Sequence, residues 1–197
     1  MNLFINYLTV RPQFYFCWVG SLVVSITLHE FSHAFMAREF GDETAASEGH
    51  LTLNPIKQMG LYSLACLFLF GICWGAVPVN RNKVSRAGQS VISAAGPFAN
   101  LLIAFCCAML LRFFPKHLLL NVALQANCLL FIFNMLPLPI LDGWGILEPF
   151  IPPMKRLSQE MRNNISGWVI FILWVTPASR ILAFLSSGLA SMILPKS

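Results

Sequence analysis

The sequence predicts an all-α protein that crosses a membrane several times. Of its 197 residues, 57% are hydrophobic and only 11% are charged, whereas a soluble globular domain carries about a quarter charged residues. Apolar runs recur along the chain, and about 20 apolar residues are enough to span a bilayer as a helix. Because these runs are too long and too many for one buried core, we expect a single polytopic membrane domain over residues 1–197.

Five apolar segments form the expected helices. In chain order they are Phe14–Ala37, Leu61–Val79, Ser90–Phe114, Leu118–Leu141 and Ile165–Leu194. The first, third and fourth are long enough to cross a bilayer. The second is marginal as a span, because Gly71, Gly75 and Pro78 interrupt it. Pro177 and Arg180 break the last segment, which is either one kinked helix or two short helices.

The first segment contains the motif His29-Glu30-Phe31-Ser32-His33. Two histidines four residues apart fall on one face of a helix, so both imidazoles can reach one metal ion. The glutamate beside the first histidine can act on a water that the metal activates. A chargeable residue in a membrane helix costs about 2.5–3.5 kcal/mol on insertion scales. Three such residues together need a reason, and a zinc site supplies one.

A catalytic zinc usually has three protein ligands and one open position for water. Outside the first segment, Asp142 is the carboxylate that closely adjoins an apolar segment. Pro137 and Pro139 precede it and should unwind the end of the fourth segment. Irregular backbone at membrane depth is tolerated only where it is buried in protein or lines a wet cavity. The sequence thus brings a carboxylate, the Asn134 amide and unpaired backbone to one membrane-embedded point.

These motifs resemble those of the site-2 proteases, a family of intramembrane zinc metalloproteases. That family carries HExxH on one transmembrane helix and N-x-x-P-x-P-x-L-D-G on another, and both are complete here. Gly49–Pro55 resembles the family's G-x-L-T-L-N-P stretch, and Ala94–Asn100 resembles its A-G-P-x-x-N helix start. Residues 73–80 depart from the W-A-K-P-V-P-V-N of short members, because the lysine and the first proline are missing. We expect no PDZ or CBS domain of the kind that larger relatives carry.

The resemblance implies hydrolysis of a peptide bond in or near a transmembrane helix of a membrane-protein substrate. Four residues match the family positions that hold one zinc ion and the general base, namely His29, His33, Asp142 and, as the base, Glu30. Asn134 is expected to contact the substrate backbone or to position Asp142, and its alternative is an interhelical hydrogen bond. Asn100 is expected either to contact the substrate or oxyanion, or to support close helix packing.

A second expectation concerns Leu51–Asn54, which alternates weakly and should form a short β-like edge near the active site. An unwound substrate could add to such an edge as an extended strand. The helices that carry the histidines and Asp142 must run roughly parallel for the three to share a metal ion. One segment between them must therefore not cross, and Leu61–Val79 is the expected re-entrant segment. The expected architecture is a three-helix catalytic core over about residues 14–148, followed by the broken C-terminal segment 165–194.

If the second segment is re-entrant, the basic loops after the second and fourth segments lie on the same side of the membrane. The positive-inside rule makes that side cytoplasmic. We expect a multi-pass protein of a prokaryotic cell membrane whose active site opens toward the cytoplasm. Expected partners are the bilayer, a transmembrane substrate and a separate regulatory membrane protein, with no nucleic acid. The alternative function is a catalytically inactive scaffold with a structural zinc site. A metal transporter is disfavoured, because the ionisable groups converge on one point.

Overall fold

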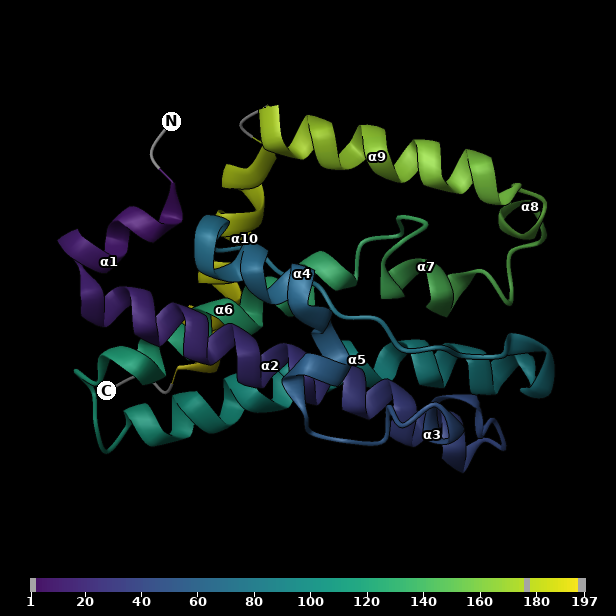
Figure 1. Ribbon diagram of the computed structural model, residues 1–197, viewed down its shortest axis with the longest axis horizontal. Coiled ribbons are helices and arrows are strands. Elements are labelled where there is room, and N and C mark those ends of the chain that lie inside the picture. The colour runs from purple at the N-terminus through teal and green to yellow at the C-terminus, as the bar shows by residue number, and fades with distance from the viewer. Residues whose placement is uncertain (1–2, 176–177, 195–197) are drawn as a thin grey trace.

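The computed structural model describes the backbone of residues 3–175 and 178–194, and the side chains of these residues except 159, 169–175, 178 and 179. Every regular element in this part of the chain is helical, as the sequence predicts (Figure 1). In chain order the elements are η1 (Phe4–Asn6), α1 (Tyr7–Val10), α2 (Pro12–Glu39), α3 (Thr44–Ser47), α4 (Pro55–Phe70), η2 (Arg81–Lys83), α5 (Arg86–Leu111), α6 (Leu118–Asn134), α7 (Asp142–Leu147), α8 (Pro152–Lys155), α9 (Gln159–Val175) and α10 (Ala178–Ile193).

Two helices, α2 and α5, are long and apolar enough to cross a membrane, and they match the first and third predicted segments. Shorter apolar helices cover Pro55–Phe70, Leu118–Asn134 and Arg180–Ile193. The predicted last segment consists of two helices, α9 and α10. Pro177, to which the break is attributed, lies outside the described residues.

The fourth predicted segment, Leu118–Leu141, is helical only as far as Asn134. Residues 135–141 are irregular, and α7 begins at Asp142. Proline lacks the N–H that a helix needs and its ring clashes with the preceding turn. The unwinding expected from Pro137 and Pro139 is therefore confirmed, and the length of the helix is corrected to 17 residues.

Helices α2, α5 and α6 pack against one another as a three-helix core. His33 of α2 hydrogen-bonds to Ile92 near the start of α5. His29, one turn earlier on α2, hydrogen-bonds to Asn100, which lies further along α5. Because the order is reversed between the two helices, α5 runs antiparallel to α2.

Helix α6 runs in the same direction as α2. Ser25 of α2 hydrogen-bonds to Asn127 in the middle of α6. His29, one turn later on α2, lies against Asp142, which follows the end of α6. This parallel arrangement is what a shared metal ion requires of ligands that sit toward the C-terminal ends of their segments.

The apolar core has two main parts. Beside the N-terminal half of α2, helices α2, α4 and α6 bury Tyr15, Val19, Leu22, Ile26, Met59, Leu67 and Ala126. The other part joins α5, α6 and α10, and it buries Ala104, Cys107, Ala108, Leu111, Leu124, Cys128 and Ala190. Helix α10 therefore belongs to the core, whereas α9 extends across the molecule above α7 (Figure 1).

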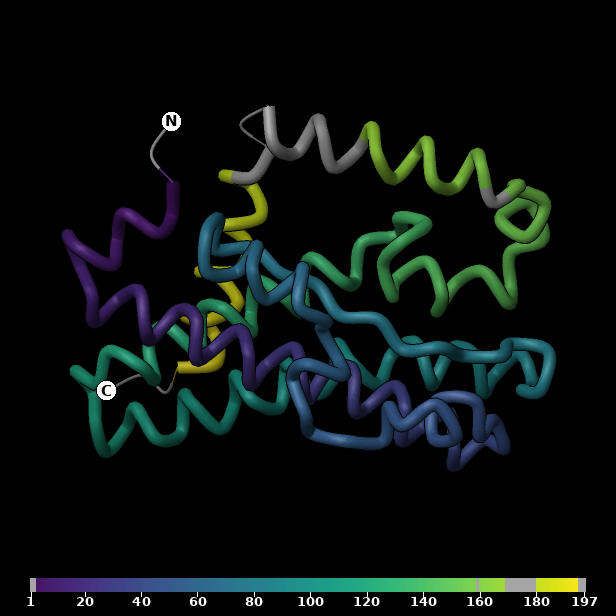
Figure 2. The backbone as a smooth tube through the Cα atoms, viewed as in Figure 1, coloured from purple at the N-terminus to yellow at the C-terminus, as the bar shows by residue number. Residues whose placement is uncertain are grey.

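Residues 55–80 run out along α2 and back again. Helix α4 packs beside α2 and ends at its N-terminal half, where Trp18 Nε1 donates to the Gly71 carbonyl at 2.9 Å. Gly71 reverses the chain with a φ of 73°, a conformation that glycine adopts without strain. Residues 72–80 then return in extended form toward the C-terminal end of α2, and Figure 2 shows this path between α4 and α5.

One edge of the returning segment is held to α4. Ser63 Oγ donates to the Trp74 carbonyl at 2.6 Å and accepts from the Trp74 amide at 2.8 Å, and the Ala76 amide donates to an α4 carbonyl at 3.2 Å. In an extended chain, neighbouring residues direct their N–H and C=O groups to opposite edges. Gly75 and Val77 therefore turn theirs away from α4, and within the described residues these groups make no hydrogen bond.

The β-like edge expected at Leu51–Asn54 is wrong, because these residues form a bend that leads into α4. The Gln58 side chain donates to the carbonyls of His50 and Thr52, each at 2.7 Å. The Asn54 side chain accepts from an amide in the first turn of α4 at 2.9 Å and caps that helix. This stretch is thus a bend that leads directly into α4, and the extended chain that lines the cavity lies within residues 72–80 instead.

Asp42 fixes the end of this extended segment. The side chain is fully buried, and its carboxylate accepts from the Asn80 amide at 2.6 Å and from the Thr44 amide and hydroxyl at 3.1 and 2.5 Å. Burial alone raises the pKa of Asp42, but these hydrogen bonds outweigh it and hold the pKa below its usual value. The carboxylate form of Asp42 thus joins the loop after α2 to residue 80.

We predict that Asp42→Asn lowers the free energy of unfolding by about 1–3 kcal/mol at pH 7, because its NH2 group would face either the Asn80 amide or the Thr44 amide. A depressed pKa stabilises the fold above the unfolded-state pKa, and this stabilisation is lost as the pH falls through the folded-state pKa. The difference in the free energy of unfolding between wild type and variant should therefore shrink below about pH 4. Thermal unfolding in detergent at both pH values tests this, with the exposed neighbour Glu43→Gln as control. An equal difference at both pH values would contradict it.

Candidate metal and catalytic site

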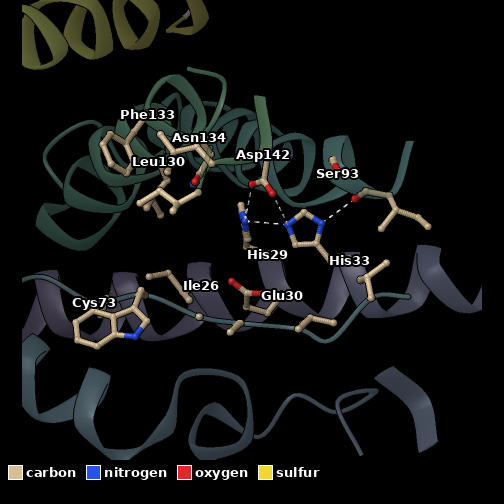
Figure 3. Close-up of a pocket in the computed structure, with 18 of the residues that line it drawn as sticks. Ile26, His29, Glu30, His33, Cys73, Ser93, Leu130, Phe133, Asn134 and Asp142 are labelled. Atoms are coloured by element: carbon tan, nitrogen blue, oxygen red, sulfur yellow. Dashed lines mark hydrogen bonds and ion pairs between the residues drawn. The ribbon is translucent and has the colours of Figure 1, made fainter. Parts of the chain in front are cut away.

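Helix α2 carries two histidines and a glutamate into the interior of the molecule. His29, Glu30 and His33 are buried, with 6–7% of each residue exposed. The two imidazoles lie one helical turn apart, as their spacing predicts. Their Nε2 atoms are 3.1 Å from each other. Figure 3 shows both rings pointing to the same place on one side of α2.

Asp142 joins the histidines from the first residue of α7. Its carboxylate oxygens lie 3.1 Å from His29 Nε2 and 3.2 Å from His33 Nε2 (Figure 3). The turn into α7 is tight, because a Cβ at Gly143 would overlap the carbonyls of Met135 and Leu136. The unwound residues 135–141 thus bring the carboxylate back against α2.

The three residues form a group that could hold one metal ion. One donor atom from each residue lies within 4.8 Å of the other two. A tetrahedral zinc with nitrogen and oxygen ligands at about 2.0–2.1 Å separates its ligand atoms by about 3.3 Å, which is close to the distances here. Gly96 of α5 leaves open the space beside both Nε2 atoms, which a Cβ would fill. The donor set, its spacing and this open cradle all fit zinc.

Helix α5 holds both imidazoles from the other side. His33 Nδ1 donates to the Ile92 carbonyl at 2.7 Å, and His29 Nδ1 donates to the Asn100 side-chain oxygen at 2.6 Å. A histidine that donates through Nδ1 keeps its Nε2 lone pair free for a metal. Both rings are therefore oriented so that Nε2 faces Asp142.

Asn100 is fully buried and lies behind His29. It is absent from the residues that line the cavity beside the site. The sequence leaves two roles open for Asn100, contact with the substrate or oxyanion and support of close helix packing. This placement fits the second role, and the side chain also bonds to His29. Its amide also donates to Asn127 of α6 at 3.0 Å.

The cavity beside the ligand group has a volume of about 730 Å³. Glu30 and Asn134 both line it, and so does the extended segment from Cys73 to Val77. Gly75 packs directly against Glu30, where a Cβ would overlap the carboxylate. The sequence-predicted residues Glu30 and Asn134 therefore share one cavity with the three candidate ligands.

A family model for peptidase family M50 matches residues 18–120. The Bacillus subtilis protein named "Putative zinc metalloprotease YwhC" is 37% identical over 175 residues, which cover 81% of this chain and 80% of that protein. The Mycolicibacterium smegmatis protein named "Putative zinc metalloprotease Rip2" is 34% identical over 189 residues, or 86% of this chain and 72% of that protein. The chain belongs to peptidase family M50, the site-2 proteases.

The similarity extends to a third organism. The Methanocaldococcus jannaschii protein named "Putative zinc metalloprotease MJ0611" is 32% identical over 134 residues, covering 62% of this chain and 65% of that protein. No solved structure matches the chain. Membership of the site-2 proteases, a family of membrane proteins, agrees with the two membrane-length helices α2 and α5.

Ser25 and Asn127 lie behind the candidate site and were not predicted from the sequence. Both are buried, and they continue the hydrogen bonds that start at His29 and Asn100. One signal for Asn127 does exist, because an amide inside an apolar helix is costly unless it is bonded. Ser25 has no such signal, since nothing in the sequence distinguishes it from Ser21.

Glu148, like Asp42, is a buried acidic residue that lies outside the predicted motifs. Its carboxylate forms ion pairs with Arg81 and, at 2.6 Å, with Arg162 of α9. The Arg162 guanidinium also lies over the Trp144 ring, 5.9 Å from its centroid. This cluster ties the start of α9 to the end of α7 beside the cavity, which Arg81 also lines.

We predict that Gly96→Ala lowers zinc affinity by about 10–100-fold, the range typical for loss of outer-shell support. The new methyl group would occupy the space beside both Nε2 atoms. Zinc per chain, measured by elemental analysis of purified protein, tests this. Gly20→Ala on α2 is the matched control, because nothing lies within 4 Å of a Cβ there. Equal zinc content in both variants would show that the cradle is not needed.

Proposed function

We propose that this chain is an intramembrane zinc metalloprotease that hydrolyses a peptide bond in or near a transmembrane helix of a membrane-protein substrate. The observation that carries the proposal is the convergence of His29, His33 and Asp142 beside Glu30 in one cavity. Ionisable residues at membrane depth are costly and are as a rule functional. The M50 family and the zinc metalloprotease names of the relatives support the same chemistry.

His29, His33 and Asp142 would hold one zinc ion per chain. When bound, zinc makes a water molecule more acidic and polarises the scissile carbonyl. The two histidines are prepared for this role because α5 accepts from both Nδ1 atoms and leaves both Nε2 atoms free. Asp142 contributes the negative charge of the ligand set.

Glu30 would act as the general base. It would accept a proton from the attacking water and deliver it to the leaving amide nitrogen. It follows the ligand His29 directly in sequence and lines the cavity in which a substrate would lie. Asn134, in the last turn of α6, lines the same cavity and would donate to the substrate backbone.

The extended segment 72–80 suggests how the substrate would be held. One of its edges is bonded to α4, while Gly75 and Val77 direct unpaired N–H and C=O groups away from α4. A helix resists proteolysis because its amides are paired, so the substrate must unwind near the scissile bond. An unwound substrate would add to this free edge as an extended strand, a common mode of peptide recognition.

We infer the membrane topology from the out-and-back path of residues 55–80. The chain leaves α2 at its C-terminal end and comes back there at Asn80, whose amide donates to Asp42, so it would enter and leave the bilayer on the same side. Basic residues follow on that side, among them Arg81 and Lys83, and the positive-inside rule makes it cytoplasmic. We therefore place the protein in a prokaryotic cell membrane with its site open to the cytoplasm, and a separate membrane protein would regulate access.

We predict that Glu30→Gln abolishes cleavage of a helix-destabilised transmembrane substrate while zinc stays near one per chain. Glutamine has the same shape but cannot accept the proton, and general bases contribute about 10²–10⁴-fold to rates. Cleavage in detergent and elemental analysis of the same sample test this. Glu39→Gln changes an exposed carboxylate of the same helix and should leave activity unchanged.

The same cleavage and zinc measurements test the alternative function, an inactive scaffold. A wild-type protein that binds zinc but cleaves none of several helix-destabilised substrates would be an inactive scaffold with a structural zinc site. A wild-type protein that binds no zinc would contradict both functions.

We predict that Val77→Pro lowers kcat/KM for cleavage by about 2–10-fold, the value of one hydrogen bond of about 0.5–1.5 kcal/mol. Proline removes the N–H but suits extended backbone, which the following Pro78 already favours. Val77→Ala keeps the N–H and serves as the matched control. Equal losses in the two variants would show that the side chain, and not the backbone edge, meets the substrate.

A further inference from the structure

A chain of side-chain hydrogen bonds leads from His29 into the protein interior, away from the cavity. It passes through Asn100 of α5 and Asn127 of α6, and it ends at Ser25 of α2. All three residues are almost completely buried, with 0%, 0% and 1% of their surface exposed. The chain therefore connects the three core helices at the level of the candidate metal site.

Main-chain carbonyls fix the direction of every bond in this chain. Asn127 lies 2.8 Å from the Ala123 carbonyl, which can only accept, so the Asn127 NH2 group faces it. The same NH2 donates to Ser25 Oγ at 2.8 Å. The remaining oxygen of Asn127 therefore faces Asn100, at 3.0 Å, and it can only accept from the Asn100 NH2 group.

The orientation of Asn100 then decides which nitrogen of His29 carries the proton. Because the Asn100 NH2 faces Asn127, and also the Ser25 carbonyl at 3.4 Å, its oxygen faces His29 Nδ1 at 2.6 Å. An oxygen in this place requires a proton on Nδ1. The lone pair of His29 then lies on Nε2, which faces Asp142.

The two histidines differ in how this proton is secured. His33 Nδ1 donates to a main-chain carbonyl, which cannot turn round. His29 depends on a side-chain amide, and an amide can rotate by half a turn and exchange its oxygen for its NH2 group. A rotated Asn100 would donate to His29 Nδ1, move the proton to Nε2 and so block that atom as a metal ligand.

We propose that Asn127 is a positioning residue that locks the Asn100 amide and thereby keeps His29 in the tautomer that can bind zinc. This inference rests on the proposed role of His29 as a zinc ligand. Ser25 and Ala123 support Asn127 in turn, so the orientation of a ligand on α2 depends on an asparagine of α6. The residue acts at a distance from the cavity and has no part in contacting substrate.

The test measures zinc affinity of the full chain in detergent by competition with a chromophoric chelator. Asn127→Leu removes the acceptor for Asn100 and should weaken zinc binding by about 10-fold, at the lower end of the effect of outer-shell partners. Asn121→Leu makes the same change on the same helix, where the amide donates only to the His117 carbonyl, and should change affinity by less than about twofold. The absorption of cobalt-substituted protein should change in the first variant only.

A second background separates positioning from simple helix packing. Both oxygens of a carboxylate accept hydrogen bonds, so Asn100→Asp has no wrong orientation toward His29 and needs no lock. In that background Asn127→Leu should no longer weaken zinc binding. If Asn127 only packed helices together, Asn127→Leu would weaken zinc binding by the same factor in both backgrounds, and the proposal would be overturned.

Two further results are informative. If Asn127→Leu does not fold, Asn127→Ala removes the same acceptor without needing extra room and takes its place in both backgrounds. Unchanged zinc affinity in the Asn127 variants, with tight binding by wild type, overturns the positioning role and leaves the proposed function intact. Absence of zinc binding by wild type overturns the proposed function and, with it, this inference.

Discussion

The close approach of α5 to α2 at Gly96 is the constraint on which the rest of the structure depends. Because Gly96 has no side chain, the α5 backbone lies against both imidazoles, and the space for an ion remains open between them and Asp142. This approach also brings the Ile92 carbonyl and the Asn100 amide within hydrogen-bonding distance of the two rings. One missing methyl group thus sets the helix spacing, the ring orientations and the ligand geometry together.

Local patterns in the sequence were enough to predict which three residues form the candidate ligand group. The four-residue spacing of His29 and His33 needs only helical geometry, and the unwinding before Asp142 needs only the chemistry of proline. Asn127 could not be found in this way, because its role depends on partners that are 27 and 102 residues away in the chain. Such contacts exist only once three helices have packed.

The error at Leu51–Asn54 has a related cause. Weak alternation of side chains describes what faces a core, but it does not show whether the backbone groups are free. At Leu51–Asn54 the chain bends, and the Thr52 carbonyl accepts from Gln58. At residues 72–80 the chain is extended, and α4 holds one of its edges. Tertiary contacts decide which of two stretches stays extended beside the cavity, and a local pattern does not contain them.

A free backbone edge in a membrane protein links specificity to the state of the substrate. Unpaired N–H and C=O groups are costly in lipid, so the edge at Gly75 and Val77 must face protein, water or a bound strand. The backbone N–H and C=O groups of an intact transmembrane helix are already paired with one another. An unwound segment has free N–H and C=O groups that can pair with those of this edge. On the proposed function, pairing therefore favours the same unwound conformation that exposes a peptide bond to Glu30, and selection and hydrolysis depend on one property of the substrate.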